Sequence, residues 1–367
     1  MNDSKVVTLG GNMRIRIQYI LLICIIFCTG CTEKAAVEDS VSSAKELSVE
    51  VPSAEKDFFA MDTYMQVTAY GEQAKEAVAQ AQTRVEELDS LLSTGIEDSE
   101  VSILNDNGEG TLSKEAFYLM MRSMDIWKMT DGAFNPAVYQ LMVLWGFTTG
   151  QYQVPEEEAI KRQLAYTNPE DITLYEDAGK VEFAKEGIKI DFGGIAKGYT
   201  SEQIIEIFRE YNIESGMVSL GGNVQVLGEK TDGSLWRVAI QNPDSEEPYL
   251  GILETKDKAV ITSGGYERYF EQDEKIYHHI LDPQTGYPAE SGLKSVTVVS
   301  EDGVLADGLS TALFVMGLGK AKEFFIDSKE DFDVILWTDE GTLYVSEGIA
   351  DSFDTDYDMQ VIRKDGD

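Results

Sequence analysis

The pattern of hydrophobic and polar residues changes its period along the chain, which predicts that helices and strands alternate. At residues 73–92 apolar side chains recur every three or four positions, the spacing of an amphipathic helix. The same spacing predicts further helices at residues 113–129, 155–166, 195–208, 304–316 and 321–326, the first of them capped by Ser113. A short helix is expected after Asn135 and Pro136, because Asn caps helices and Pro suits the first helical turn.

Short apolar or alternating stretches bounded by turn residues predict the strands. They lie at residues 58–70, 172–175, 180–183, 188–190, 236–242, 252–255, 259–261 and 294–300, with a hairpin at 334–337 and 342–345. No linker rich in Pro, Gly or Ser interrupts residues 58–348. We therefore expect an α/β (α+β) fold with mixed β-sheets flanked by helices, one compact unit over residues 57–350, and an acidic C-terminal tail at 351–367.

The N-terminus has the features of a targeting segment. The basic stretch Met13-Arg-Ile-Arg16 precedes an apolar run at residues 17–28, and Thr29-Gly30-Cys31 follows. This order resembles a bacterial lipoprotein signal, in which the cysteine after a small residue is lipidated. We predict a signal peptide at residues 1–30 and lipidation of Cys31.

The same segment sets the expected location. Residues 31–56 are polar and aperiodic, which is typical of a flexible tether. The sequence thus predicts an extracytoplasmic protein, lipid-anchored to a bacterial cell membrane. An uncleaved membrane anchor is the alternative, although the apolar run is shorter than the roughly 20 residues that a spanning helix needs. Because Met13 directly precedes the basic residues, a start at Met13 is also expected, with residues 1–12 as an extension.

Cysteine content and charge narrow the function classes. The three cysteines are Cys24, Cys28 and Cys31, so the expected folded body has no cysteine nucleophile, thiolate metal site or disulfide. The chain carries 66 acidic and 30 basic residues, a formal charge of -36. Such a surface argues against nucleic acid as a partner, since phosphates need a basic footprint. An anionic ligand would need a local metal ion or backbone N–H groups.

Residues 277–311 hold the densest set of candidate chemical groups. His278 and His279 are the two histidines of the chain, and histidine is the side chain suited to proton transfer near neutral pH. Asp307 and Thr311 lie four apart, on one face of the predicted helix, and two such oxygen ligands suit Mg²⁺. An Asp that caps the helix and a Thr that bonds to the preceding turn explain the same residues equally well.

Three Gly-Gly turns at strand ends suggest one cleft built from several loops. The first, at Asp191-Phe-Gly-Gly-Ile-Ala-Lys-Gly-Tyr199, leads from a strand into a helix, where backbone N–H groups can approach phosphate and Lys197 can add positive charge. The others are Ser219-Leu-Gly-Gly-Asn223 and Thr262-Ser-Gly-Gly-Tyr266. Glycines required only for tight turns remain the alternative.

Taken together, these stretches resemble the ApbE family of FAD:protein FMN transferases, exported flavin-handling enzymes that are often lipoproteins. The motifs that carry the resemblance are Met61-Asp-Thr, Leu92-Ser-Thr with Asp98-Ser-Glu and Asn105, Asp131-Gly-Ala-Phe-Asn-Pro, Leu144-Trp-Gly-Phe, Asp191 to Tyr199, Leu220-Gly-Gly-Asn, Thr262-Ser-Gly, His279-Ile-Leu-Asp-Pro with Thr285-Gly, and Asp307 with Thr311. Their common order along the chain makes the set specific. The chain departs from the family at Gly95, where an aromatic residue that touches FAD is common.

The resemblance implies a reaction and a set of site residues. FAD is the donor, Mg²⁺ sits on its diphosphate, and FMN passes to a Ser or Thr hydroxyl of an acceptor flavoprotein with the motif Asp-x-x-Ser/Thr-Gly-Ala-Thr, releasing AMP. The implied metal ligands are Asp307, Thr311 and a backbone carbonyl near Gly194. The implied FAD contacts are Met61, Ala133, Phe134, Asn135, Asp191, Lys197, Ser263 and His279.

Two residues receive catalytic roles by the same resemblance. Asp307 would act through the metal, and His279 would take the proton of the acceptor hydroxyl. The alternative for His279 is a structural role at the Asp282-Pro283 turn, and His278 is expected to be structural. Two other functions stay open: an FAD pyrophosphatase that yields FMN and AMP, and a non-catalytic FAD-binding lipoprotein.

Overall fold

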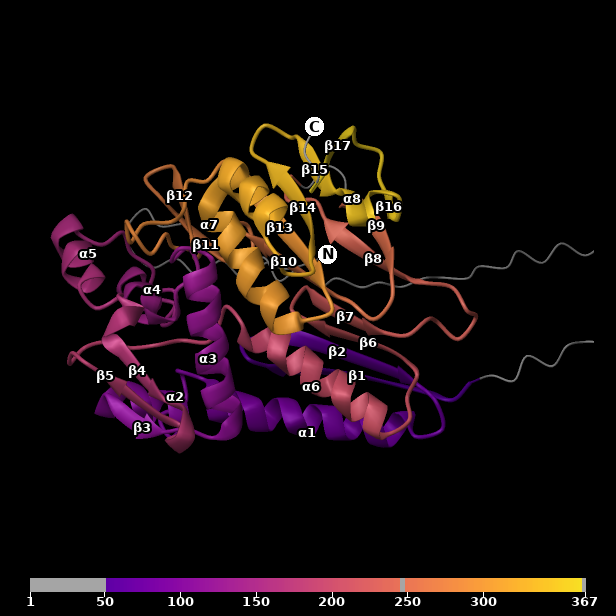
Figure 1. The fold of residues 1–367 in the computed structure, drawn as a ribbon, viewed down its shortest axis with the longest axis horizontal. Coiled ribbons are helices and arrows are strands. Elements are labelled where there is room, and N and C mark those ends of the chain that lie inside the picture. Colours follow the sequence, from indigo (N-terminus) through magenta and orange to yellow (C-terminus); the bar gives the residue numbers. More distant parts are fainter. Residues whose placement is uncertain (1–50, 245–247, 365–367) are drawn as a thin grey trace, which may run out of the picture.

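The computed structural model describes residues 51–244 and 248–364, and its centre is a mixed β-sheet (Figure 1). In this part of the chain nine strands pair in the order β1 (Ser53–Ala60), β2 (Thr63–Tyr70), β6 (Ser215–Leu220), β7 (Asn223–Leu227), β10 (Ala259–Gly264), β13 (Leu293–Ser300), β14 (Asp333–Thr338), β15 (Leu343–Ser346) and β17 (Met359–Ile362). The β15–β17 pair is parallel and the other neighbours are antiparallel. The expectation of a mixed sheet is confirmed.

Three helices pack on one face of this sheet. They are α1 (Ala74–Leu92), α6 (Ala196–Glu210) and α7 (Gly303–Asp327), which lie side by side across the strands (Figure 1). Buried residues of α1 and α6, such as Val85 and Phe208, form a core with β2 and β6, because the apolar stripe of each helix faces the sheet. The helices predicted at 73–92 and 195–208 are thereby confirmed.

The central helix α7 is apolar over most of its length. Within the described residues it is the helix long and apolar enough to cross a membrane, with a mean hydropathy of 1.3, yet 67% of that window is buried inside the protein. It therefore serves as the core helix between the sheet and its helical neighbours. The sequence predicted two helices here, at 304–316 and 321–326, and the structure confirms them: α7 consists of two helical segments that meet at Gly317, whose φ of 76° and ψ of 168° are not helical.

The opposite face of the sheet is covered by a second, smaller sheet. Its strands are ordered β16 (Phe353–Asp354), β9 (Tyr249–Thr255) and β8 (Trp236–Gln241). Trp236, Leu253 and Phe353 pack against apolar residues of the central sheet, including Trp337. The two sheets thus enclose a core that is separate from the helical layer.

The remaining elements form a lobe at one end of the central sheet (Figure 1). They are α2 (Glu100–Asn107), β3 (Glu109–Thr111), α3 (Lys114–Met129), η1 (Pro136–Val138), α4 (Tyr139–Trp145), α5 (Glu157–Leu164), η2 (Pro169–Asp171), β4 (Ile172–Tyr175), η3 (Glu176–Ala178), β5 (Lys180–Phe183), β11 (Tyr269–Gln272) and β12 (Lys275–His278), while α8 (Glu347–Ala350) lies near the C-terminus. The predicted caps are confirmed. Ser113 Oγ accepts from Ala116 N, and Asn135 Oδ1 accepts from Ala137 N over 2.8 Å.

The boundaries predicted at the two ends of the fold are wrong. Residues 53–56, expected in the tether, belong to β1, and residues 58–70 form a hairpin whose turn residues Met61 and Asp62 have φ of 48° and 57°. The expected acidic tail after residue 350 contributes β16 to one sheet and β17 to the other. These strands have only two and four residues and lie within an acidic segment, so they produce no clear local pattern.

Two further differences concern the stretch that leads to Asp191. Residues 188–190 are not a strand, because the side-chain amide of Asn105 takes the place of a strand partner. Asn105 Nδ2 donates to Ile190 O over 2.8 Å, and Ile190 N donates to Asn105 Oδ1 over 2.7 Å. The helix that presents Asn105, α2, was not predicted from the sequence.

Candidate active site

The site predicted from the sequence is assembled around Asp307 on α7. Its carboxylate is 4% exposed and accepts hydrogen bonds from two directions. Gly198 N, in the first turn of α6, donates to Oδ2 over 2.8 Å, and Asn223 Nδ2 donates to Oδ1 over 3.2 Å. Asp307 therefore joins α7 to the glycine-rich turn of residues 191–199 and to the turn between β6 and β7.

This geometry refines the expectation for the glycine-rich turn. Its backbone N–H groups were expected near phosphate, but Gly198 N donates to Asp307, and Gly193 N donates to Asp191 Oδ1 over 2.6 Å. The N-terminus of α6 thus stabilises a carboxylate of the protein itself. The alternative that Asp307 caps its own helix is wrong, because the cap of α7 is Asp302; the Asp307 carboxylate instead accepts from the first turn of α6.

A cluster of hydroxyl groups lies one helical turn further along α7. Ser263 Oγ, near the end of β10, lies 2.8 Å from Ser310 Oγ and 3.2 Å from Thr311 Oγ1. The Thr311 hydroxyl therefore has a partner on a neighbouring strand, whereas the local alternative placed its partner in the preceding turn of its own helix. Ser263 and Thr311, predicted for FAD and metal respectively, are in direct contact.

Lys197, in the first turn of α6, supplies the positive charge of the site. Its field lowers the pKa of Asp307 and Glu267 and also that of His279. Burial has the larger effect on Asp307 and raises its pKa to about 6. The lysine consequently lies where it can compensate a buried carboxylate and an incoming anion.

His279, directly after β12, is held in a defined tautomer. Its Nδ1 lies 3.1 Å from Arg268 O, and because a carbonyl only accepts, Nδ1 carries the proton and Nε2 the lone pair. Loss of hydration lowers the pKa of His279 to about 3, and the charge of Arg268 acts in the same direction. The imidazole is therefore neutral at pH 7, the form that can accept a proton.

Asp191 and His279 are half-buried and Glu267 is exposed. Loss of hydration is nevertheless the largest cause of the pKa change in each of the three groups. Nearby protein therefore removes water from these groups without covering their side chains fully. Burial raises the pKa of Asp191, and it raises that of Glu267 to about 7.

The other predicted FAD contacts lie on loops around this centre. Met61 N donates to Asp89 Oδ2, and Thr200 Oγ1 on α6 lies 3.6 Å from Met61 Sδ. Gly194 faces the Phe134 ring so closely that a Cβ there would lie 2.9 Å from Cε2. These contacts link three motifs that are far apart in the sequence.

The segment Ala133 to Asn135 is oriented mainly by structural bonds. Asn135 Nδ2 donates to Thr167 O over 2.8 Å and Oδ1 accepts from Ala137 N, so both the nitrogen and the oxygen of its side-chain amide have partners within the protein. Ala133 lines a cavity of about 710 Å³ together with Asp282 and with Met316 of α7. Contact of this segment with a ligand would therefore involve the backbone or the Phe134 ring.

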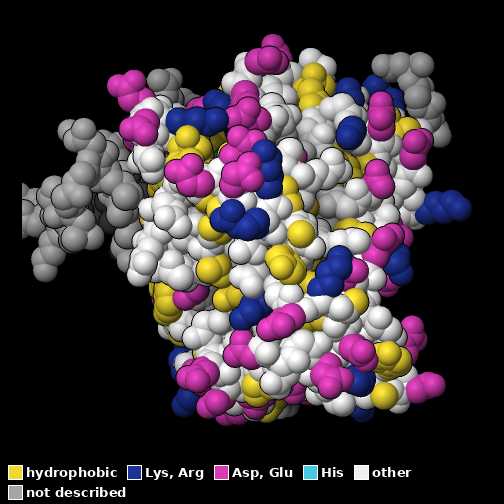
Figure 2. Space-filling model, turned by 90° about the vertical axis from the view of Figure 1, so that its left-hand side faces the viewer, with side chains coloured by type: hydrophobic (Ala, Val, Ile, Leu, Met, Phe, Trp, Pro, Cys, Tyr) yellow, Lys and Arg dark blue, Asp and Glu magenta, His cyan; other side chains and the backbone are white. Residues whose placement is uncertain are grey.

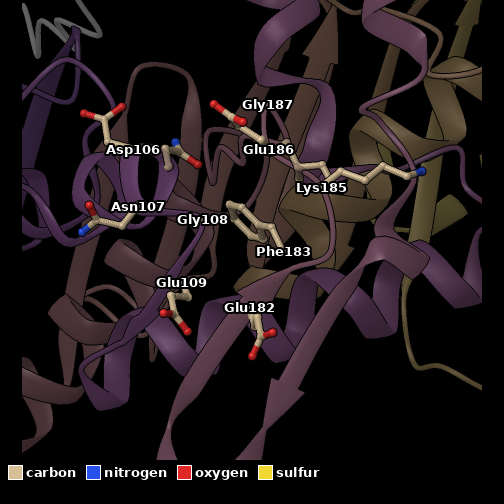
Figure 3. A pocket seen from close by; sticks show the side chains of 11 residues that line it. Asp106, Asn107, Gly108, Glu109, Glu182, Phe183, Lys185, Glu186 and Gly187 are labelled. Atoms are coloured by element: carbon tan, nitrogen blue, oxygen red, sulfur yellow. The ribbon is translucent and has the colours of Figure 1, made fainter.

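A second cavity, of about 320 Å³, lies away from this centre. Figure 3 shows it between the end of α2 and the residues after β5, with the carboxylates of Asp106, Glu109 and Glu182 around it. These acidic groups already have partners: Lys189 lies 2.9 Å from Asp106, and Lys180 lies 2.6 Å from Glu109 and 3.4 Å from Glu182. The cavity offers no unpaired charge from these three groups for a ligand.

Sequence reasoning missed three residues at the site: Glu267, Asn223 and Arg268, whose carbonyl oxygen holds His279. Glu267 lies near Lys197 and Asp307, and its only sequence signal is its position three residues after Gly264. Asn223 belongs to the Leu220-Gly-Gly-Asn motif, to which the sequence alone assigns no role. For Glu267 and Asn223 the role depends on contacts between distant loops, which a single sequence does not show.

Charged side chains of both signs are mixed on one face of the molecule. Figure 2 shows the side that lies on the left in Figure 1, where Lys and Arg side chains lie among Asp and Glu with apolar patches between them. A separate basic patch is not visible on that face.

Fold and site together define an α/β protein in which loops at the ends of a mixed sheet gather a buried carboxylate, hydroxyl groups and a lysine, a set suited to a nucleotide diphosphate. The chain belongs to the ApbE family, whose model matches residues 61–336.

Named relatives and solved structures agree with this assignment. An FAD:protein FMN transferase of Escherichia coli (strain K12) is 32% identical over 332 residues, covering 88% of this chain and 92% of the relative. One of Klebsiella pneumoniae (strain 342) is 37% identical over 229 residues, covering 62% of this chain and 70% of the relative. The crystal structure of the ApbE protein from Thermotoga maritima superposes with a TM-score of 0.76 at 33% identity, and flavin transferase ApbE from Vibrio cholerae with 0.73 at 28%; each comparison covers 81% of this chain and 98% of the other.

Proposed function

We propose that this chain is an FAD:protein FMN transferase, which moves FMN from FAD to a Ser or Thr hydroxyl of an acceptor flavoprotein carrying Asp-x-x-Ser/Thr-Gly-Ala-Thr. The acceptor oxygen bonds to the phosphorus of the FMN half, the P–O bond of the diphosphate breaks, and AMP leaves with the bonding electrons. The observation that carries the proposal is the buried Asp307 carboxylate, with Lys197 nearby and the Thr311 hydroxyl one helical turn away.

The residues around Asp307 fit a magnesium ion. One carboxylate and one hydroxyl are hard oxygen donors, and Mg²⁺ commonly takes one or two protein carboxylates and completes its shell with substrate phosphates and water. Within residues 51–244 and 248–364 no group of three or more His, Cys, Asp or Glu side chains is arranged as an all-protein metal site. Asp307, Thr311 and the Gly194 carbonyl would hold the ion, and when bound it would neutralise charge on the diphosphate.

His279 is the proposed general base. A hydroxyl is a poor nucleophile at neutral pH, and a positioned base contributes about 10²- to 10⁴-fold to such a step. Nε2 carries the lone pair because Nδ1 donates to Arg268 O. Lys197 and the ordered loops would orient the diphosphate, since phosphoryl transfer depends mainly on alignment and charge neutralisation.

An FAD pyrophosphatase is the second candidate function. His279 and Asp191 keep contact with solvent, so water can reach the groups that would otherwise face the acceptor hydroxyl. Water in place of the hydroxyl would give free FMN and AMP. The presence of the acceptor then decides which product forms.

One experiment separates these functions. The purified protein is incubated with FAD, Mg²⁺ and an acceptor domain that carries the motif, and the products are resolved by denaturing gel fluorescence and chromatography. We expect covalent flavin on the acceptor, lost in Asp307→Asn and with EDTA. Free FMN without acceptor labelling would favour the pyrophosphatase, and unchanged FAD would leave a flavin-binding protein.

We further propose that the protein is lipid-anchored outside the cytoplasm. The support is the sequence pattern that ends at Cys31, which lies outside the described residues, as does most of the expected tether. In cells fed a labelled fatty acid, the protein should take up label and fractionate with membranes. Cys31→Ser should abolish the labelling while Cys24→Ser leaves it unchanged; labelled Cys31→Ser protein would contradict the proposal.

A further inference from the structure

The turn between β6 and β7 places a buried amide against Asp307. Asn223 is 3% exposed, and its Nδ2 donates to Oδ1 of the carboxylate, while Gly198 N donates to Oδ2. Each carboxylate oxygen therefore has a donor from a different element. A carboxylate held at both oxygens resists rotation about its Cβ–Cγ bond, so its remaining lone pairs point in one direction.

The position of the amide is set by rigid backbone. Gly221 and Gly222 have φ of 62° and 98°, which allows the tight turn directly before Asn223. Gly221 N donates to Tyr64 O over 3.0 Å, and a Cβ at Gly221 would lie 2.1 Å from Thr63 Oγ1. The turn is thus packed directly against the start of β2, just after the Met61 motif.

An amide suits the task of holding a metal-binding carboxylate. It donates a hydrogen bond to the charged group without adding a positive charge that would repel a cation at the same oxygen. The charge of Lys197 acts on Asp307 through its field, and the Lys197 backbone N–H adds a hydrogen bond; among the described residues no hydrogen bond from its ammonium group to Asp307 is observed. Partners of this kind typically change metal affinity by about 10- to 100-fold when they are lost.

We infer that Asn223 is a positioning residue that aims the Asp307 carboxylate at the metal of the transferase site, and that the Leu220-Gly-Gly-Asn motif serves this purpose. The inference rests on the proposed function, because it requires Asp307 to be a metal ligand. It assigns a role to the one glycine-rich motif of the sequence that the proposed reaction does not otherwise use.

The test is metal affinity measured separately from turnover. Mn²⁺ is titrated into the protein with saturating FAD and no acceptor, and free Mn²⁺ is followed by EPR. Asn223→Ala should raise the Kd for Mn²⁺ by about 10- to 100-fold. The Kd for FAD without metal, from flavin fluorescence, should stay within about two-fold of the wild type, since the amide acts on the carboxylate and not on FAD.

The matched control is Asn242→Ala. Asn242 is also buried, at 5% exposure, and its Nδ2 donates to Tyr357 Oη in another part of the molecule. This variant loses an equivalent amide but should keep both affinities. Asn223→Gln offers a second variant that retains a buried amide while moving its N–H by one methylene, and it too should bind Mn²⁺ more weakly.

Three results would overturn the inference. A folded Asn223 variant with wild-type Mn²⁺ affinity removes the positioning role, and an equal loss of metal-free FAD affinity makes Asn223 a flavin-binding residue instead. If neither variant folds, NMR of the unaltered protein labelled with ¹⁵N-asparagine gives the answer. The signal of the Asn223 side-chain amide should shift when Mg²⁺ is added to the FAD complex, and that of Asn242 should not. An unchanged Asn223 signal contradicts the role. Wild-type Mn²⁺ affinity in Asp307→Asn would instead disprove the proposed metal site itself.

Discussion

At the residue scale, burial shifts the pKa values of the two principal groups of the site in opposite directions, and both shifts favour the uncharged form. His279 has its pKa lowered to about 3 and Asp307 has its pKa raised to about 6, in each case chiefly through loss of hydration. The first shift keeps the imidazole neutral and able to accept a proton. The second makes the carboxylate an unfavourable charge until a cation reaches it.

His279→Ala should lower kcat for FMN transfer by about 10²- to 10⁴-fold, because a positioned base is lost. Because the His279 pKa is lowered, the base form persists as pH falls to about 3, so His279 should cause no loss of rate between pH 8 and 5.

The control is His278→Ala. His278 packs edge-on against Phe314 and its Nε2 lies 3.1 Å from Ala289 O, so its loss should lower Tm and leave kcat nearly unchanged. Stopped-time assays of acceptor labelling measure both; wild-type kcat in His279→Ala would reassign the base.

Asp307→Asn should stabilise the metal-free protein at pH 8. Since the folded pKa of about 6 exceeds the ordinary 3.8, the stability that Asp307 contributes is full below the unfolded value and is lost as pH rises through the folded value. About two pKa units correspond to about 3 kcal/mol, as an upper estimate for the gain from the neutral isostere. Urea unfolding with EDTA at pH 8 and pH 4 measures it: at pH 4, close to the ordinary pKa, most of the gain should be lost, and destabilisation at pH 8 would contradict this expectation.

At the element scale, the contact between α6 and α7 sets the geometry of the proposed metal site. Gly198 lies so close to the start of α7 that a Cβ would be 2.1 Å from Gly303 O and 2.9 Å from Asp307 Cβ. Glycine at this position permits the approach that brings the first turn of α6 to the Asp307 carboxylate. The glycine-rich motif is thus explained by helix packing as well as by its turn.

Gly198→Ala should therefore separate the two helices, cost about 1–3 kcal/mol of unfolding free energy through overpacking, and weaken Mn²⁺ binding. Gly319→Ala, also within a helix, is the control: a Cβ there meets nothing within 4 Å, and about 0.5–1 kcal/mol should be gained. Chemical denaturation compares the two variants. Equal stability of Gly198→Ala and wild type would mean that the helices can move apart without cost.

The elements that the sequence predicted well are those whose signals are local. The periodicity of residues 73–92 and the caps at Ser113 and Asn135 depend on neighbours within a few positions, and these predictions are confirmed. The strand predicted at residues 188–190 is wrong because the side chain of Asn105, 85 positions from Ile190, supplies the hydrogen bonds that a strand partner would make. The role of Asn223 was hidden for the same reason, since its partner Asp307 is 84 residues distant.

At the scale of the whole molecule, the C-terminal residues complete both sheets. β17 pairs in parallel with β15, and Phe353 packs between the sheets at 4% exposure, so closely that a Cβ at Gly251 would lie 2.4 Å from Phe353 Cζ. Parallel strands are joined by a crossover, here residues 347–358, and not by a tight turn, so the pair leaves no local turn signal in the sequence. This arrangement explains why the sequence reading placed an acidic tail where the structure has strands.

Phe353→Ala should cost about 3–5 kcal/mol of unfolding free energy, because it leaves a cavity between the sheets. Phe59→Ala on β1 provides the control, since Phe59 is 69% exposed and its loss should change stability by no more than about 0.5 kcal/mol. Urea unfolding measures both. Equal, small effects would mean that the C-terminal strands contribute little to the fold.

The central claim is that Asp307 and Thr311 hold a divalent ion on the diphosphate of FAD. Its most direct test is a crystal structure of the protein with FAD and Mn²⁺, with the ion located by anomalous scattering. We expect an anomalous peak for an ion that is bound by the Asp307 carboxylate and Thr311 Oγ1 and contacts the FAD diphosphate. A peak elsewhere, with the diphosphate remote from both residues, would contradict it.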